Sequence, residues 1–378
     1  MAKRKAQPEH VSIEDAIAAA GERARNPLFL PRQIGRVPTD YHALGALLGG
    51  ADNPGIPTGC FMEILGQQHA GKTSLTFALA DAIINRPDGT HTVLADGGKH
   101  TLPVPRRVLF LDFERTLDLK YFAQCARNLK LAEVNDKGKL TNLKQANLFV
   151  HQPDTLEEGC DVMLEMIRSG EIGLVVIDSV PSMLSEEERV KSMQESTVGK
   201  QARAMGQLFR KAVPLVSRYG VTVALINQWR DKIGVSFGDP RTAPGGKAIA
   251  YYVTHRLDVS GTHKTPWFEE GKLLKVKAMK NKISGHRGEC LYHLERGHGI
   301  SREVEATEMG EAASIVTRKG SSYSVNVRGE KISERGKANW VGFLRSHPKL
   351  TASLGKQAAK RGVVGGGSAI PNEGGWDQ

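Results

Sequence analysis

Residues 66–73 read Gly66-Gln67-Gln68-His69-Ala70-Gly71-Lys72-Thr73, between an apolar run at residues 60–65 and a segment of helical periodicity that begins at Ser74. The pattern is G-x-x-x-x-G-K-[ST], in the strand-to-helix context that a phosphate-binding loop requires. Glycines let backbone N–H groups curl around phosphate oxygens, and the positive end of the helix dipole points at the same place. We therefore predict that this loop and Ser74 bind a nucleoside triphosphate, with Lys72 at its β and γ phosphates and the Thr73 hydroxyl on Mg²⁺.

The sequence around this loop alternates between two periodicities. Short apolar runs lie at residues 60–65, 108–111, 174–177 and 221–226, and segments of helical period lie at residues 74–84, 156–167 and 199–217. This alternation predicts an α/β fold with a mostly parallel central sheet covered by helices. Two further runs should extend the sheet as antiparallel strands, because only a short connection separates them; they are residues 256–259 and 273–277.

Two insertions interrupt the alternation. Between Pro87 and Pro105, two β-like runs flank an Asp-Gly pair, which predicts a surface hairpin. Residues 130–145 are polar and rich in lysine, and we expect an inserted loop there.

Composition divides the chain into four parts. Residues 1–37 contain a predicted short helix and a proline-containing linker, and residues 38–300 form the α/β core. Residues 301–361 should be a small basic α/β domain, because residues 318–361 hold 11 Lys and Arg against 2 Glu and still show apolar helical positions. Residues 362–378 are rich in glycine, and we expect them to be disordered.

The overall composition excludes several classes of protein. A 40% apolar content is too high for a disordered chain, and the net charge of +11 favours a polyanionic partner. No apolar run is long enough for a membrane span, and no apolar stretch follows the basic N-terminus as in a secretory signal. The four cysteines are far apart in the sequence, which is typical of reduced thiols in a cytoplasmic protein.

Carboxylates follow two of the apolar runs. Asp178 ends the run LVVID, which has the form of a Walker B strand whose carboxylate holds Mg²⁺ through water. Glu114 follows the run VLFLD, where it could orient and deprotonate an attacking water. From spacing alone, a surface glutamate at the start of a loop is an equal alternative for Glu114.

A fourth apolar run ends in Asn227-Gln228, and an amide at that place can sense the γ-phosphate. The next segment, residues 229–246, has glycine, proline and basic residues with the aromatic Phe237 among them. A long loop of this composition inside a compact domain is typical of a single-stranded nucleic-acid contact. An ordinary surface loop is the alternative.

Together these motifs resemble the bacterial type of the RecA family of recombinases. The resemblance covers residues 38–360 and rests on several motifs in the family's order. Besides the phosphate-binding loop they are LDFERTLDLKYF (residues 111–122), HQPDTLEEG (151–159), VVIDSV (175–180), INQWRDKIGVSFGDPRTAPGG (226–246), KAMKNKISG (277–285) and GEKISERGKAN (329–339).

The resemblance implies roles for individual residues. Glu114 falls on the catalytic glutamate, and Asp118 and Tyr121 fall where adenine is contacted. Gln228 matches the glutamine that couples the γ-phosphate to the DNA-binding loops. Lys280 and Lys282 match lysines that reach across a subunit interface to the ATP of the neighbouring subunit.

The resemblance also implies a set of DNA-binding residues, which are Gly199, Arg203, Arg210, Arg230, Lys232, Ile233, Phe237, Arg241, Gly245 and Gly246. The first DNA loop, residues 185–197, lacks the glycines that the family usually shows. The two insertions are extra to the family pattern.

The expected function is that of a DNA-dependent ATPase with ATP and Mg²⁺ as ligands. It would form a filament of many copies on single-stranded DNA and exchange strands with a homologous duplex, with residues 1–37 taking part in assembly. Alternatives are a small-molecule phosphotransferase, a DNA-coating protein that does not hydrolyse ATP, and a relative of hexameric helicases. The basic loop at residues 229–246 and the presence of Glu114 argue against the first two, and the Lys280 and Lys282 pattern fits a filament better than a helicase ring.

Overall fold

The structure is a computed structural model that describes residues 34–86, 90–95, 98–103, 105–137, 139–190, 199–231, 241–285 and 287–363. Several predicted features lie outside these ranges. They are the helix and linker before residue 34, the Asp96-Gly97 turn, residues 191–198 of the first DNA loop, the residues Lys232, Ile233 and Phe237, and the tail from residue 364.

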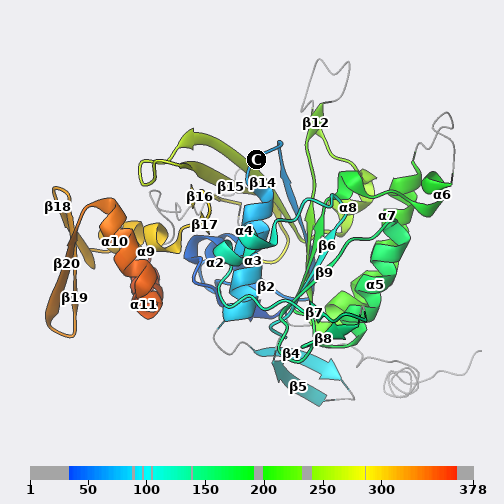
Figure 1. The fold of residues 1–378 in the computed structure, drawn as a ribbon, viewed down its shortest axis with the longest axis horizontal. Helices are drawn as coiled ribbons and strands as arrows, with labels where there is room; N and C mark the ends of the chain where they lie inside the picture. Colours follow the sequence, from blue (N-terminus) through cyan, green and yellow to red (C-terminus); the bar gives the residue numbers. More distant parts are fainter. Residues whose placement is uncertain are drawn as a thin grey trace, which may run out of the picture.

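A nine-stranded sheet organises the molecule, in the order β17-β16-β15-β14-β3-β11-β10-β6-β9 (Figure 1). All neighbouring pairs from β14 to β9 are parallel, and the pairs from β14 to β17 are antiparallel. The bounds are β3 Cys60–Gly66, β6 Val108–Asp112, β9 Leu148–His151, β10 Leu174–Asp178, β11 Thr222–Ile226, β14 His255–Lys264, β15 Gly271–Asn281, β16 Glu289–Glu295 and β17 Gly299–Ile300. The predicted α/β class, the parallel centre and the antiparallel extension are confirmed.

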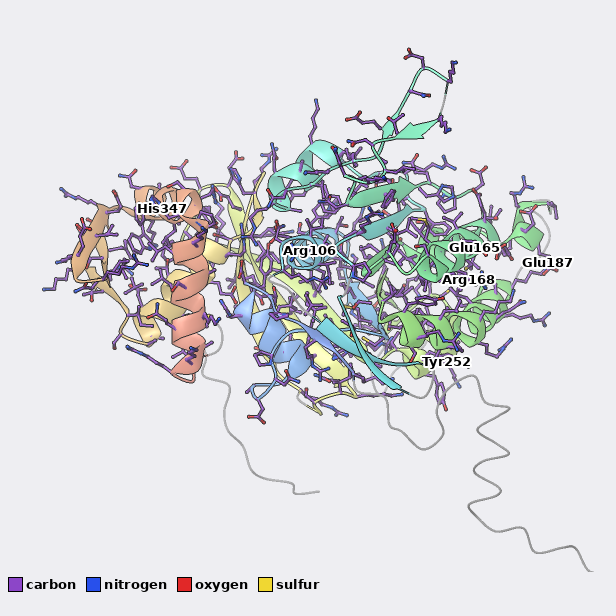
Figure 2. All side chains as sticks on the ribbon, turned by 90° about the horizontal axis from the view of Figure 1, so that it is seen from below. Arg106, Glu165, Arg168, Glu187, Tyr252 and His347 are labelled. Atoms are coloured by element: carbon purple, nitrogen blue, oxygen red, sulfur yellow. The ribbon has the colours of Figure 1, made fainter. Side chains whose placement is uncertain are left out.

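Helices cover both faces of the sheet because neighbouring strand residues point to opposite sides. Met62 and Phe110 belong to the core under α2 His42–Gly49, α3 Lys72–Asn85 and α4 Leu119–Cys125. Phe61 and Leu109 belong to the core under α5 Leu156–Arg168, α7 Lys200–Tyr219 and α8 Gly246–Tyr252. The outer faces are polar, as in the pair of Glu165 and Arg168 on α5 at 2.5 Å (Figure 2).

The first insertion forms the predicted hairpin, with β4 Thr90–Ala95 antiparallel to β5 Gly98–Pro103. The second insertion is more ordered than the expected loop, because β7 Glu133–Val134 pairs with β8 Leu140–Thr141. Smaller elements complete the core: β1 Arg36–Val37, β2 Ile56–Pro57, η1 Val180–Ser182, α6 Glu186–Arg189, β12 Arg230–Asp231 and β13 Arg241–Thr242.

The C-terminal part lies beside the antiparallel edge of the sheet (Figure 1). It consists of α9 Arg302–Ala312, the meander β18 Val316–Lys319, β19 Ser322–Val327 and β20 Glu330–Arg335, α10 Lys337–Ser346 and α11 Pro348–Lys360. Tyr323, Trp340 and Leu344 are buried in its own core, where the Trp340 indole N–H donates to Thr307 Oγ1 at 2.8 Å. The division of the chain at residues 300 and 361 stays a prediction.

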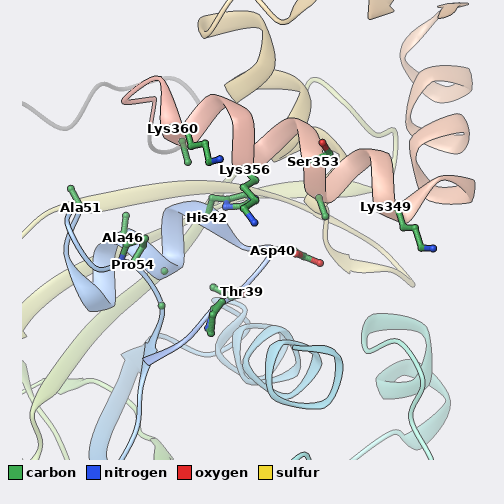
Figure 3. A pocket seen from close by; sticks show the side chains of 15 residues that line it. Thr39, Asp40, His42, Ala46, Ala51, Pro54, Lys349, Ser353, Lys356 and Lys360 are labelled. Atoms are coloured by element: carbon green, nitrogen blue, oxygen red, sulfur yellow. The ribbon is translucent and has the colours of Figure 1, made fainter. Parts of the chain in front are cut away.

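The C-terminal part meets the core at α2. The buried Glu305 accepts a hydrogen bond from the Ala43 N–H at 2.7 Å. A cavity of about 560 Å³ lies between α2 and α11, and Figure 3 shows His42 on one side of it and Lys349, Lys356 and Lys360 on the other. Among the helices in the described ranges, none has both the length and the apolar character to cross a membrane.

Candidate functional site

Four parallel strands end at one edge of the sheet and bring the predicted nucleotide-binding residues together. Asp178 at the end of β10 pairs in register with Asp112 on β6, and Ile226 at the end of β11 pairs with Ile64 on β3. The loops that follow these strands therefore start side by side. The carboxyl ends of parallel strands are the usual place for a ligand in this class of fold.

The phosphate-binding loop needs glycine at both of its motif positions. Gly71 has φ 99° and caps α3, and a Cβ there would lie 2.7 Å from Leu274 Cδ1. A Cβ on Gly66 would lie 2.4 Å from the Val259 carbonyl oxygen. Any larger residue would push the loop away from β14 and β15, so the close packing on these strands fixes the loop's shape.

Lys72 lies folded back on this loop. Its Nζ donates to the Gln67 carbonyl at 2.7 Å and to the Gly66 carbonyl at 3.2 Å, and the residue is only 7% exposed. Burial lowers the pKa of Lys72, and the carboxylates of Asp178 and Glu114 act in the opposite direction. The ammonium group is therefore held at the cavity by weak partners that a phosphate can replace.

Thr73 and Asp178 form an oxygen pair beside Lys72. The Thr73 hydroxyl donates to Asp178 Oδ2 at 3.2 Å. Burial raises the pKa of Asp178 to about 7, and the neighbouring Glu114 carboxylate adds to the effect. A buried carboxylate near a second carboxylate and a hydroxyl is a hard-oxygen donor set, and this donor set suits Mg²⁺.

Glu114 is held by residues that follow β10. Its carboxylate accepts hydrogen bonds from the Ser179 hydroxyl and, at 3.5 Å, from the Ser182 hydroxyl. Its own N–H donates to the Asp178 carbonyl at 3.2 Å. Glu114 and Asp178 are thus fixed relative to each other through both backbone and side chain.

Asp112 holds the segment that carries Glu114. It is 1% exposed, and its carboxylate accepts from the N–H groups of Thr116 at 3.3 Å and Leu117 at 3.2 Å and from Gln152 Nε2 at 2.9 Å. Sequence reasoning did not single out this residue, although its place at the end of an apolar run beside a second such run was a usable signal.

The residues predicted at adenine lie at one side of the loop. The Tyr121 hydroxyl lies 3.2 Å from Ser74 Oγ, and burial raises the pKa of Tyr121 to about 12. Asp118 caps α4, where its carboxylate accepts from the N–H groups of Lys120 and Tyr121. Asp118 thus has a local structural role, and its contact with adenine stays a prediction.

One cavity of about 510 Å³ collects most of the predicted nucleotide-binding residues. Its lining comprises Gln68, His69, Ala70, Gly71, Lys72, Thr73, Ser74, Glu114, Thr116, Tyr121, Asp178, Ile226, Gln228, Lys272 and Leu294. A second cavity of about 730 Å³ contains Asp118 and shares Tyr121, Lys272 and Leu294 with the first. Sequence reasoning missed Lys272 and Leu294, because only the strand pairing of β14, β15 and β16 brings them to the loop.

Lys280 and Lys282 lie outside the two cavities, at the end of α8. Lys280 Nζ donates to the Ala250 carbonyl at 2.5 Å, and Lys282 Nζ donates to the Tyr251 carbonyl at 3.2 Å. Burial and the neighbouring Lys282 lower the pKa of Lys280 to about 8. The structure does not bring these lysines to the cavity of their own chain.

The predicted DNA-binding residues that the structure describes surround α7 and α8. Gly199 has φ 80° and caps α7, which carries Arg203 and Arg210. Arg230 on β12 pairs with Thr242 on β13, so a short ladder closes the base of the second predicted loop. Gly245 and Gly246 lead into α8 with φ 86° and 75°, and a Cβ on Gly246 would lie 2.8 Å from Ala202 Cβ on α7.

A polar network joins this loop base to the sheet. The indole N–H of Trp229 donates to Asp258 Oδ1 at 2.7 Å, and Arg241 Cζ lies 4.6 Å from the centroid of the Trp229 ring. Glu63 on β3 is 1% exposed and accepts from Arg256 Nε at 2.6 Å and from Asn227 Nδ2 at 2.8 Å. The strand that leads to the phosphate-binding loop is therefore bonded to the segment before the second loop.

Comparisons with known proteins agree with this geometry. The family model described as the RecA N-terminal domain matches residues 31–301. The chain is 33% identical over 321 residues to Protein RecA 1 of Myxococcus xanthus, which covers 84% of this chain and 81% of that protein. It is 32% identical to Protein RecA of Acidothermus cellulolyticus over 95% of this chain and 92% of the relative, and 32% identical to Protein RecA of Methylococcus capsulatus over 96% and 94%. With the family model matching most of the chain, the protein belongs to the RecA family.

Proposed function

We propose that the protein is a DNA-dependent ATPase that assembles on single-stranded DNA and catalyses pairing and strand exchange with a homologous duplex in recombination and repair. One observation carries the proposal. A single cavity contains residues 68–73 of the phosphate-binding loop together with Asp178, Glu114 and Gln228, on a chain of the RecA family. The second predicted DNA loop begins one residue after Gln228.

ATP binds at this loop. Backbone N–H groups at the start of α3 and the Lys72 ammonium hold its phosphates, and Tyr121 and Asp118 hold the base. Thr73 and Asp178 would hold Mg²⁺, which neutralises charge on the β and γ phosphates when it is bound.

Glu114 acts as the general base. Its carboxylate orients a water molecule and takes a proton from it, while the water oxygen forms a bond to the γ-phosphorus and the bond to the bridging oxygen of ADP breaks. Ser179 and Ser182 keep the carboxylate in place through their hydrogen bonds. Lys72 stabilises the charge on the transferring group.

Assembly completes the site. Lys280 and Lys282 of one copy reach the triphosphate of the next, because within their own chain they lie on the carbonyls of α8, away from the cavity. Their charge then acts as a finger supplied in trans. Since one filament binds ATP and DNA together, each ligand raises the affinity for the other by the same factor.

Single-stranded DNA is bound by the loops around α7 and α8, and the partner duplex is read by base pairing. Gln228 links the γ-phosphate to this region, because its own N–H donates to the Asn227 side chain, which in turn holds Glu63 and the Pro244 carbonyl. We place the protein in the cytoplasm, since its substrate is DNA.

The test is ATP hydrolysis with and without single-stranded DNA, for the wild type and for Glu114→Gln. We expect strong stimulation by DNA in the wild type, and loss of hydrolysis with retained DNA binding in the variant. Affinity for DNA should fall steeply as salt rises, because phosphate neutralisation releases counterions. Hydrolysis that is independent of DNA would overturn the proposal in favour of a phosphotransferase.

A further inference from the structure

Lys272 enters the nucleotide cavity from a strand outside the motifs of the sequence. It is the second residue of β15, and its Nζ donates a hydrogen bond to the His69 carbonyl in the phosphate-binding loop. Lys272 lines both cavities, at the point where the phosphate part meets the part that contains Asp118. The motifs that carry the family resemblance do not include this position.

Close packing fixes the backbone and the path of Lys272. A Cβ on the preceding Gly271 would lie 2.6 Å from the Leu294 carbonyl oxygen, so β15 and β16 approach too closely for a side chain there. On the facing strand, a Cβ on Gly261 would lie 3.2 Å from Lys272 Cδ and 3.0 Å from the Ala70 carbonyl oxygen. Gly261 thus leaves room for the lysine stem to run under the loop.

The bond to His69 acts on the loop conformation. His69 has φ 58°, a left-handed backbone that histidine adopts less readily than glycine. The ammonium group holds the carbonyl of this residue on the β15 side. The N–H of the same peptide unit, on Ala70, then points the opposite way, because carbonyl and N–H of a trans peptide are antiparallel.

Lys272 also adds a positive charge to the cavity that contains Lys72. Lys272 and Lys72 line the same cavity, so the site holds two side chains of the same charge. Two ammonium groups that repel each other are both stabilised when an anion lies between them.

We propose that Lys272 is a nucleotide-positioning residue that acts in cis, by holding the His69 carbonyl and by adding a second cation at the phosphate end of the cavity. This inference rests on the proposed function, and names a further residue of that same site. Its ligand is a nucleoside polyphosphate, and the phosphates are the part that Lys272 recognises.

The experiment measures nucleotide binding by the full chain without DNA, at a dilution where copies do not assemble. Lys272→Met removes the charge and keeps the aliphatic stem, and Lys272→Arg keeps the charge. Lys264→Met is the matched control, since Lys264 pairs with Lys272 across the strands and is exposed. The probes are a fluorescent ATP analogue and adenosine as a competitor.

We expect Lys272→Met to raise the Kd for ATP about tenfold, equivalent to about 1.4 kcal/mol, and to leave competition by adenosine unchanged. Lys272→Arg should recover most of the affinity, and Lys264→Met should match the wild type. Hydrogen exchange at the amides of residues 67–71 should be faster in nucleotide-free Lys272→Met.

An unchanged Kd for ATP in Lys272→Met, or equal losses for ATP and adenosine, would overturn the inference. If Lys272→Met does not fold, Lys272→Gln takes its place and is judged by the same outcomes. Failure here is distinct from failure of the proposed function. Equal ATP binding by wild type and Lys272→Met would overturn the role of Lys272 and would not affect the proposal of a DNA-dependent ATPase. ATP hydrolysis that is independent of DNA would overturn the proposed function, and the binding measurement on Lys272 would still be valid.

Discussion

The two ends of β15 present lysines in opposite situations. At the start of the strand, Lys272 bonds to the phosphate-binding loop of its own chain. At the other end, Lys280 and the nearby Lys282, just past the strand, donate to carbonyls at the end of α8, and neither lines the nucleotide cavity of its own chain. Under the two proposals, lysines near the two ends of one strand serve two nucleotide sites, one in the same subunit and one in its neighbour.

The difference follows from how strands are joined. The hairpin of β14 and β15 packs one end of β15 against the loop, as the contact between Gly71 and Leu274 shows. An extended strand advances about 3.3 Å per residue, so the far end lies well beyond the reach of a lysine side chain. A pocket completed in cis is present in a single chain, whereas one completed in trans requires assembly.

Removal of the trans lysines should have the largest effect. We expect Lys280→Ala with Lys282→Ala to reduce DNA-dependent hydrolysis about 10³-fold, the effect of removing a finger supplied in trans. Binding of ATP by dispersed protein should stay unchanged, in contrast to Lys272→Met. Steady-state hydrolysis and a binding titration on the same preparations measure both.

A mixing experiment checks the subunit assignment. Lys72→Ala lacks a working phosphate-binding loop but still offers Lys280 and Lys282 to its neighbour. Mixed with the double variant on DNA, it should restore part of the hydrolysis. No recovery over the separate proteins would contradict action in trans.

The next largest effect should come from the loss of Glu63, which holds the strand that faces the far end of β15. Arg256 pairs with Lys280 across the strands and is held by the buried Glu63. Glu63→Ala leaves the arginine without this partner, and we expect the free energy of unfolding to fall by about 3 kcal/mol. Urea unfolding measures the change.

The control for this prediction is Glu289→Ala. Glu289 forms an exposed pair with Lys275 at 3.6 Å. Its loss should change the stability by less than about 0.5 kcal/mol. Similar losses for the two variants would mean that the buried network does not anchor the strand.

A smaller effect should appear in the pH profile. Burial, with Lys282 and Arg256 nearby, lowers the pKa of Lys280 to about 8, and Glu63 acts in the opposite direction. The charged form is present below the pKa and is lost as the pH rises through it, so DNA-dependent hydrolysis should decline with a midpoint at pH 8 or above, because a nearby phosphate favours the charged form.

Lys280→Arg separates this titration from other causes. The guanidinium stays charged throughout the range, so the variant should keep a flat profile up to pH 9. Profiles of wild type and variant that decline together would show that another group titrates.

Strand and loop patterns predicted much of the fold and the cis site. Apolar runs marked the central strands to within a residue or two, because buried parallel strands need unbroken apolar sequence. Gly66, Gly71, Lys72 and Asp178 could be named from spacing, since a phosphate-binding loop and a strand-end carboxylate are local features. Glu114 needed the family resemblance, because a carboxylate after a strand has many roles.

Other parts of the site had no local signal. Lys272 and Leu294 come from strands more than 190 residues after the phosphate-binding loop, and strand order places them there. Ser179 was visible beside Asp178, but its bond to Glu114 depends on the register of β6 and β10. Glu63 could not be identified from the sequence, because the role of a buried carboxylate depends on partners that only the fold brings to it.

The amino-acid order alone specified where a triphosphate can be held, because glycine conformation, a helix start and one lysine act within eight consecutive residues. Which lysines line that cavity was decided by three-dimensional packing. The antiparallel hairpin places one end of β15 at the loop and the other end away from it. The spacing of residues along the chain does not predict which end meets the loop.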